Sequence, residues 1–148
     1  MRYLAAILLL AAFAPCGHPQ GISPLISELK QGKKDTKTEM QVINASVHPL
    51  TAVLEVREIK FKDGKGSVIP VTSNLHVQLS ETTIKIPPQQ TRTILINAKC
   101  DQLPCAFAIQ STFSGARTNV GASIRVSLGN SWYVCERTKD CRANFQKQ

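Results

Sequence analysis

Apolar residues recur at every second position through most of this chain, and this spacing restricts the folds that it can adopt. The clearest example is residues 120–128, where apolar side chains alternate with Gly, Ser and Arg. Alternation over roughly four to nine residues is typical of strands that are buried on one face. The same period occurs in shorter runs at residues 40–44, 52–57, 84–86, 94–96 and 107–110. No segment between Gly21 and Leu128 has the period of an amphipathic helix, so we expect an all-β protein.

Short segments that contain Gly or Pro separate these runs. They lie at residues 31–33, 48–49, 63–66, 87–88, 103–104 and 114–115. About seven strands with frequent turns predict a seven-stranded, immunoglobulin-like antiparallel β-sandwich. The Cys, Trp and Cys core of antibody domains is missing, because the single tryptophan, Trp132, follows the last strong strand.

The N-terminal segment has the features of a secretory leader. Residues 3–14 are apolar or small and uncharged, and Arg2 is the only basic residue before them. This segment is too short to span a membrane comfortably, and no later stretch is apolar enough to do so. We therefore expect a leader at residues 1–20, a sandwich at residues 21–128 and a short, basic, disulfide-stapled tail at residues 129–148. The protein is expected to be periplasmic or secreted, with no transmembrane segment after the leader.

The formal net charge is +8, and most of the excess lies in residues 85–148, which hold 9 basic and 3 acidic residues. A basic region can bind nucleic acid, an anionic surface or an acidic protein, or it can simply be solvated. Export from the cytosol argues against nucleic acid. Binding to acidic glycans or membranes would require the basic residues to converge on one face, namely Lys85, Arg92, Lys99, Arg117, Arg125 and Arg137.

Four cysteines follow the leader, and an even number in an exported chain predicts two disulfides. Three pairings are possible, of which we favour the local ones, Cys100–Cys105 and Cys135–Cys141. The spacings are slightly wide for structural zinc, and no C-x-x-C redox motif is present. A fifth cysteine, Cys16, stands at the leader boundary in a poor lipobox, so its lipidation is left open.

The chain lacks the motifs of the common enzyme classes. Outside the leader boundary its histidines are His48 and His76, each far in sequence from the other, and no Gly-x-Ser-x-Gly, His-Glu-x-x-His or phosphate-binding loop occurs. No carboxylates cluster at metal-ligand spacing. We expect neither catalysis nor a cofactor or metal.

Asn44 begins the tripeptide Asn-Ala-Ser, which admits two interpretations. The tripeptide fits an N-glycosylation sequon, which matters only in a eukaryotic source. Alternatively, the Asn44 side chain organises the turn that follows its strand through bonds to the backbone.

Several features follow one another in a fixed order along the chain. They are Ile22-Ser23-Pro24 at the first strand, residues 40–44 before a Pro-containing turn, the strand 51–59, a charged Gly-rich hairpin, and residues 77–86 leading through Pro87-Pro88 into the strand that ends at Ile96. This order spans residues 22–128 and resembles the N-terminal domain of periplasmic pilus-assembly chaperones. Sperm-protein-like and other immunoglobulin-like modules share several of the same features.

The resemblance implies a function in which the last strand of the sandwich is lent to an incomplete pilin. The partner would be an exported pilin-like subunit, with an outer-membrane usher as a further partner. Main-chain hydrogen bonds would supply affinity, and alternate apolar side chains would select the register. The side chains implied are Val120, Ala122, Ile124, Val126 and Leu128.

Three departures from the family leave an alternative open, and one of them is the pair Cys100 and Cys105, a staple where the family usually has a plain connection. The family holds its subunit's terminal carboxylate with an Arg and a Lys, but the corresponding positions here are Leu25 and Ser123, so Arg117 and Arg125 are the substitutes we consider. Pilus chaperones also continue into a second β-domain, whereas only the short tail follows Leu128. The alternative is an extracytoplasmic structural or adhesion module without chaperone activity, whose last strand is covered rather than open.

Overall fold

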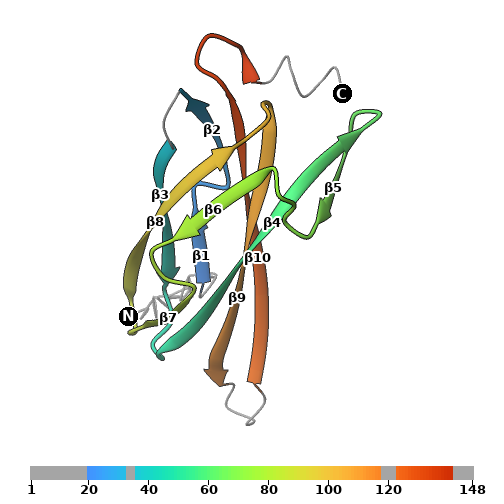
Figure 1. The fold of residues 1–148 in the computed structure, drawn as a ribbon. Helices are drawn as coiled ribbons and strands as arrows, with labels where there is room; N and C mark the ends of the chain where they lie inside the picture. The colour runs from blue at the N-terminus through green and yellow to red at the C-terminus, as the bar shows by residue number, and fades with distance from the viewer. Residues whose placement is uncertain (1–19, 33–35, 118–122, 142–148) are drawn as a thin grey trace, which may run out of the picture.

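The computed structural model describes residues 20–32, 36–117 and 123–141, without the side chains of residues 116, 117, 123 and 124, and they form two sheets packed as a sandwich (Figure 1). One sheet has the order β1 (Gln20–Ser23), β3 (Thr36–Asn44), β8 (Gln90–Cys100) and β6 (Leu75–Leu79). The other has the order β2 (Ile26–Gln31), β10 (Ser123–Glu136), β9 (Cys105–Arg117), β4 (Leu50–Lys62) and β5 (Lys65–Ile69), with β7 (Thr83–Ile86) also paired to β4. The predicted all-β sandwich is confirmed.

The described residues form ten strand segments rather than the seven expected. One cause is that the first predicted strand divides at Pro24 into β1 and β2, which lie in different sheets. Proline has no backbone N–H to donate to a ladder, so a strand does not continue through it unchanged. β2 then pairs with β10 in parallel, whereas the sequence predicted only antiparallel neighbours. Gln20, which the prediction assigned to the leader, is the first residue of β1, while residues 1–19 lie outside the described part of the chain.

The last strand is longer than the alternation at residues 120–128 predicted. β10 runs to Glu136, so residues 129–136 belong to the sandwich and not to a separate tail. Trp132 is fully buried and stacks on Phe107, with ring centroids 5.3 Å apart. The strand was missed because Asn130 places a polar side chain at an inward position, where the apolar period would require a hydrophobic one.

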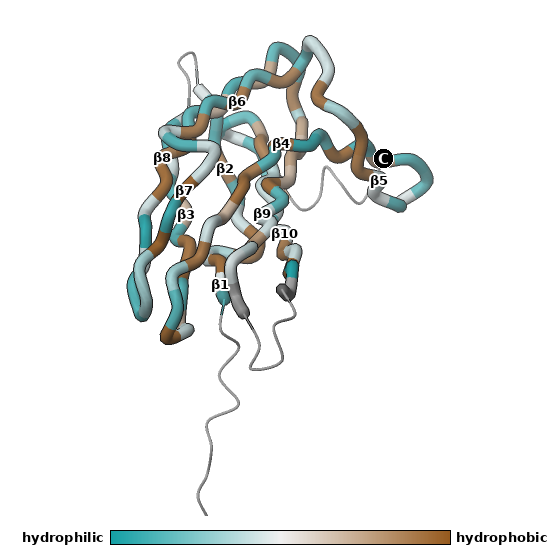
Figure 2. The backbone as a smooth tube through the Cα atoms, turned by 90° about the horizontal axis from the view of Figure 1, so that it is seen from below, coloured by the Kyte–Doolittle hydropathy of each residue, from teal (hydrophilic) through white to brown (hydrophobic). Residues whose placement is uncertain are grey.

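The core lies between the two sheets, and hydrophobic and hydrophilic residues alternate along the strands (Figure 2). One sheet buries residues such as Met40 and Ile94, and the other buries Leu50, Phe107 and Phe113. Each aliphatic or aromatic side chain removed from water in this way contributes about 1.5–3 kcal/mol. The period of two therefore produces the sandwich by giving every long strand one apolar face.

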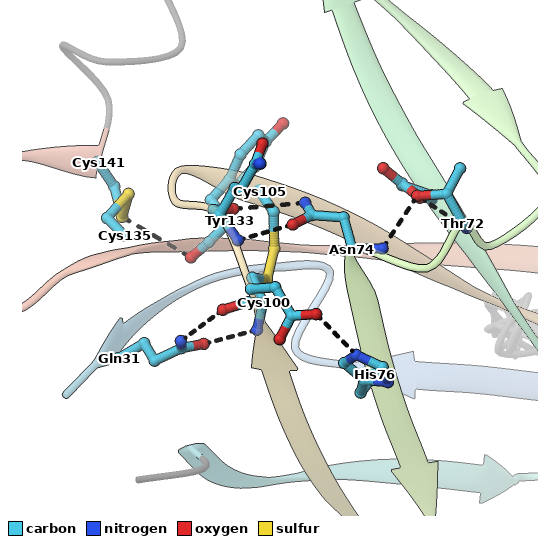
Figure 3. The surroundings of a disulfide bond; sticks show 12 residues. Gln31, Thr72, Asn74, His76, Cys100, Cys105, Tyr133, Cys135 and Cys141 are labelled. Carbon is cyan, nitrogen blue, oxygen red and sulfur yellow. Dashed lines mark hydrogen bonds and ion pairs between the residues drawn. A yellow bond between two sulfur atoms is a disulfide. The ribbon is translucent and has the colours of Figure 1, made fainter. Parts of the chain in front are cut away.

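Both predicted disulfides are present. Cys100–Cys105 joins the end of β8 to the start of β9 and so links the two sheets (Figure 3). Beside it, the Gln31 amide donates to the backbone O of Cys100 and accepts from its backbone N, both at 2.8 Å. Cys135–Cys141 closes a loop after β10, and Cys141 is buried with Ala106 on the outer face of the six-stranded sheet. These contacts tie β2, β8, β9 and β10 together at one end of the sandwich.

The Asn44 side chain is buried and organises the turn between β3 and β4. Its Nδ2 donates to the backbone O atoms of His48, Ile86 and Pro87 at 2.8–3.1 Å, and its Oδ1 accepts from the backbone N of Ser46 at 3.0 Å. The turn function is therefore confirmed. Because Nδ2 is buried and already donating, the folded chain does not present Asn44 for glycosylation.

Replacing Asn44 is expected to destabilise the fold strongly. We expect Asn44→Ala to lower the free energy of unfolding by about 2–4 kcal/mol, because it leaves buried carbonyl groups without donors. Ser46→Ala removes a half-buried hydroxyl that donates to Asn44 Oδ1 at 2.6 Å and leaves the Asn44 Nδ2 bonds in place, so it should cost about 1 kcal/mol. Urea unfolding of both variants tests this, and equal losses would contradict the role assigned to Asn44.

Candidate functional site

The last two long strands form a hairpin that extends beyond the rest of the six-stranded sheet (Figure 1). β9 and β10 pair from Arg117↔Ser123 to Cys105↔Val134. The neighbouring strand β4 reaches only as far as Ser114 on β9. Beyond Ser114, therefore, β9 and β10 pair only with each other among the described residues.

One edge of β10 is open over more than half of the strand. β9 occupies its other edge from Ser123 to Val134, but β2 pairs with it only from Ser131 to Glu136. In the described part of the chain, no strand pairs with residues 123–130 on the β2 side. We call this stretch the open edge.

The backbone groups that face the open edge can be assigned from the ladder. The backbone N of Ser131 donates to the O of Leu25 at 2.9 Å, so the polar groups of Ser131 point toward the β2 side. Successive residues of a strand point these groups to opposite sides. The N–H and C=O of Ser127 and Gly129 therefore point into the open edge, while those of Leu128 point toward β9.

The structure describes part of the row of apolar side chains that is predicted to bind the subunit, which we call the donor row. Val126 and Leu128 are half-buried on the inward face, where Leu128 packs against the core, and the row continues inward through Trp132. The backbone of Ile124 pairs with Ala116. Val120 and Ala122 lie outside the described residues.

The two arginines considered as carboxylate contacts come from the same end of the hairpin. Arg117 pairs with Ser123, and Arg125 is exposed two residues further along β10. The ladder is irregular here, because Ile124 pairs with Ala116 but Val126 pairs with Phe113.

Three buried polar atoms on the inward face of β9 and β10 were not predicted from the sequence. Ser111 Oγ, Asn130 Oδ1 and Trp132 Nε1 have no hydrogen-bond partner among the described residues. Each unsatisfied group of this kind costs about 1–3 kcal/mol. The only sequence signal was the polar Asn130 in an apolar row. These atoms weaken the core next to the open edge.

The basic residues of the second half do not meet on one face. Lys85 lies on the outer face of β7 in the six-stranded sheet, whereas Lys99 lies on the outer face of β8 in the four-stranded sheet, and Arg92 is exposed at the start of β8. The outer faces of the two sheets point in opposite directions. The arrangement required for binding acidic glycans or membranes is therefore not formed by these residues.

The two histidines of the described ranges are exposed and belong to no metal-binding cluster there. His48 is exposed in a turn, and His76 Nε2 lies 3.1 Å from Asp101 Oδ2 at the surface. No three His, Cys, Asp or Glu side chains of the described residues lie close enough to hold a metal ion. Nor do these residues include a helix of the length and apolarity that crossing a bilayer requires.

Glu58 is a buried carboxylate with a structural role. Its side chain is 2% exposed, with Lys60 Nζ at 2.6 Å from Oε1 and the backbone N of Thr72 at 2.9 Å from Oε2. Burial alone would raise the pKa of Glu58, but the hydrogen bonds from Lys60 and Thr72 outweigh it and lower the pKa below 4.5. The carboxylate thereby fixes the connection between β5 and β6 onto β4.

The lowered pKa predicts a pH-dependent contribution to stability. A carboxylate whose pKa is lower in the folded than in the unfolded chain stabilises the fold above the unfolded value of 4.5. This contribution is lost as the pH falls through the folded pKa. We expect Glu58→Gln to lower the free energy of unfolding by about 1–3 kcal/mol at neutral pH, with the difference from wild type narrowing in acid. Urea unfolding across this pH range measures it.

Glu55 provides the matched control for Glu58. It lies on the same strand but is exposed, and its partner is the exposed Arg57 at 2.8 Å. We expect Glu55→Gln to change stability by less than about 0.5 kcal/mol at any of these pH values. A Glu58→Gln effect that stayed constant with pH would contradict the lowered pKa.

Comparison with known proteins shows the fold. No protein-family model and no curated protein sequence match this chain. The Class 5 fimbriae chaperone CfaA matches 82% of it with a TM-score of 0.65, at 12% identity and over 58% of the chaperone chain. A chain of the CsuC–CsuE chaperone–tip adhesion subunit complex, from the archaic Csu pili of Acinetobacter baumannii, matches 80% with a TM-score of 0.60, at 9% identity and over 52% of that chain.

A PapD-like domain from a different source has a similar length. PapD-like domain 7 of human CEP192 matches 95% of this chain over all of its own length, with a TM-score of 0.55 and 10% identity. The protein thus spans little more than half of the chaperone chains and the whole of this domain. The resemblance indicated by the sequence is confirmed at the level of the fold, which is that of pilus chaperones and PapD-like domains.

Proposed function

We propose that this protein is a periplasmic, chaperone-like protein that binds an exported pilus or fimbrial subunit by strand addition along the open edge of β10. The observation that carries the proposal is the stretch of residues 123–130, which has no strand partner on the β2 side among the described residues, while its other edge pairs with β9. Extended segments bind such edges through main-chain hydrogen bonds, and alternate side chains set the register. An outer-membrane usher is a further proposed partner.

The side chains of the open edge suit a partner strand. Ser127 and Gly129 stand on the outer face and are small, so they allow another backbone to approach. Val126 and Leu128 are half-buried on the inner face and would lose their remaining exposure under an added strand. The donor row is proposed to continue through Ile124, Ala122 and Val120.

The charged end of the hairpin gives the proposed partner a second contact. Arg125 is exposed near the start of the open edge, and Arg117 pairs there with Ser123. We propose these two arginines as contacts for a carboxylate of the partner. Exposed ion pairs contribute about 1 kcal/mol or less, so they would select a partner more than hold it.

A second candidate function is a structural or adhesion module without chaperone activity. One observation favours it: Leu128 already packs against the described core, so the alternation of β10 serves the fold without any partner. On this alternative the open edge takes part in no binding. The same experiment distinguishes the two functions.

A proline substitution tests the edge without disturbing the ladder to β9. The N–H of Ser127 faces the open edge, so Ser127→Pro removes that donor and leaves the β9 pairing intact. We expect about tenfold weaker retention of the subunit, since a main-chain bond is lost and the ring obstructs approach. The measurement is affinity purification of the full chain from the periplasm of its native cells, with retained subunits quantified by mass spectrometry.

Ser127→Ala is the matched control. Both variants lose the hydroxyl that accepts from Gln110 Nε2 at 2.9 Å, but only the proline loses the backbone donor. We expect Ser127→Ala to retain the subunit within about twofold of wild type. Equal retention by both variants would refute strand addition and favour the structural module. If Ser127→Pro is unfolded by circular dichroism, Val126→Asp replaces it, because a charge on the inward row also opposes the added strand.

A further inference from the structure

Two large aliphatic side chains are exposed at the point where the open edge of β10 ends. Leu25 is 63% exposed and Ile26 is 67% exposed. They follow Pro24, where the chain crosses from β1 to β2. The carbonyl O of Leu25 accepts from the backbone N of Ser131, and Ile26 pairs with Ser131. Leu25 and Ile26 therefore lie directly in line with any strand that occupies the open edge.

The fold gives no reason for these residues to be apolar. On β2, Leu29 is buried, and alternation along the strand places Ile26 on the opposite, outer face. Leu25 precedes the strand in a bend. Single exposed aliphatic residues are ordinary on protein surfaces, whereas these two are adjacent and lie at the end of an unpaired edge.

The surroundings of Leu25 and Ile26 are uncharged. Residues 23–27 and 129–131 contain no ionisable side chain, and the first charged residue along β2 is the acidic Glu28. Arg125 lies six residues from Ser131 along β10, which is about 20 Å at about 3.4 Å per residue. The open edge thus has a basic end at the hairpin and an apolar end at the crossover.

We infer that Leu25 and Ile26 form an apolar contact for the end of the strand that adds to β10. The inference rests on the proposed function and states the chemistry of its partner. The added segment carries a large aliphatic or aromatic side chain at the crossover end, and not a carboxylate. Residues 23–27 and 129–131 would offer a carboxylate at this end no cation, and the first charged side chain along β2 is the acidic Glu28.

Substitution of the two residues tests the contact. The probe is the exported subunit that wild type retains from the periplasm and Ser127→Pro loses. We expect Leu25→Ser and Ile26→Ser each to reduce its retention about tenfold, since each removes a large apolar contact. Leu95→Ser is the control, because Leu95 is 60% exposed on β8 in the other sheet and should retain the subunit fully.

Leu25→Arg tests whether the partner strand has an apolar or an anionic side chain at the crossover end. We expect it to reduce retention as Leu25→Ser does, whereas increased retention would show a carboxylate at this end and overturn the inference. Full retention by Leu25→Ser and Ile26→Ser would also overturn it, and would leave strand addition in place if Ser127→Pro still loses the subunit. Both the inference and the proposed function fail if every subunit that wild type retains is also retained by Ser127→Pro, or if wild type retains none. Thermal unfolding of each variant confirms that it is folded.

Discussion

Pro24 determines how much of β10 stays open. Because proline cannot donate to a ladder, the chain crosses between the sheets at this residue, and β2 begins only at Ile26. Pairing with β10 therefore starts at Ser131, and the earlier described residues of β10 have a neighbour on one side alone. The same crossover exposes Leu25. One missing backbone N–H thus accounts for both the length of the open edge and the exposure of Leu25 at its end.

The end of β2 is joined to both sheets. Gln31, its last residue, exchanges two hydrogen bonds with the backbone of Cys100, which is itself joined to Cys105. β2 is thereby fixed to both sheets while it pairs with β10. Such fixation keeps the open edge in one geometry before a partner arrives, and this lowers the ordering cost of binding.

The sequence predicted the elements that have local signals and missed those that depend on distant partners. The alternation at residues 120–128 predicted the described first part of the last strand, and the even cysteine count predicted two disulfides, for which the favoured local pairings are present. The extension of β10 was hidden by Asn130, and the parallel pairing of Ile26–Gln31 left no period to detect. Whether an alternating strand is open or covered is decided by a neighbour elsewhere in the chain, so the open edge itself could not be predicted.

In the described part of the chain, the six-stranded sheet has a second unpaired edge, at β5. Unpaired strand edges promote self-association, and proteins commonly protect them with lysine side chains. β5, at the far edge of the same sheet, has Lys65 at its first position but then presents Gly66, Ser67 and the exposed Val68. The open edge of β10 likewise has a basic residue, Arg125, near its start and then presents Ser127 and Gly129. Side-chain composition therefore does not distinguish the two edges, and the binding role proposed for β10 rests on geometry: residues 123–130 have no strand neighbour on the β2 side among the described residues, and this stretch ends at the exposed Leu25 and Ile26.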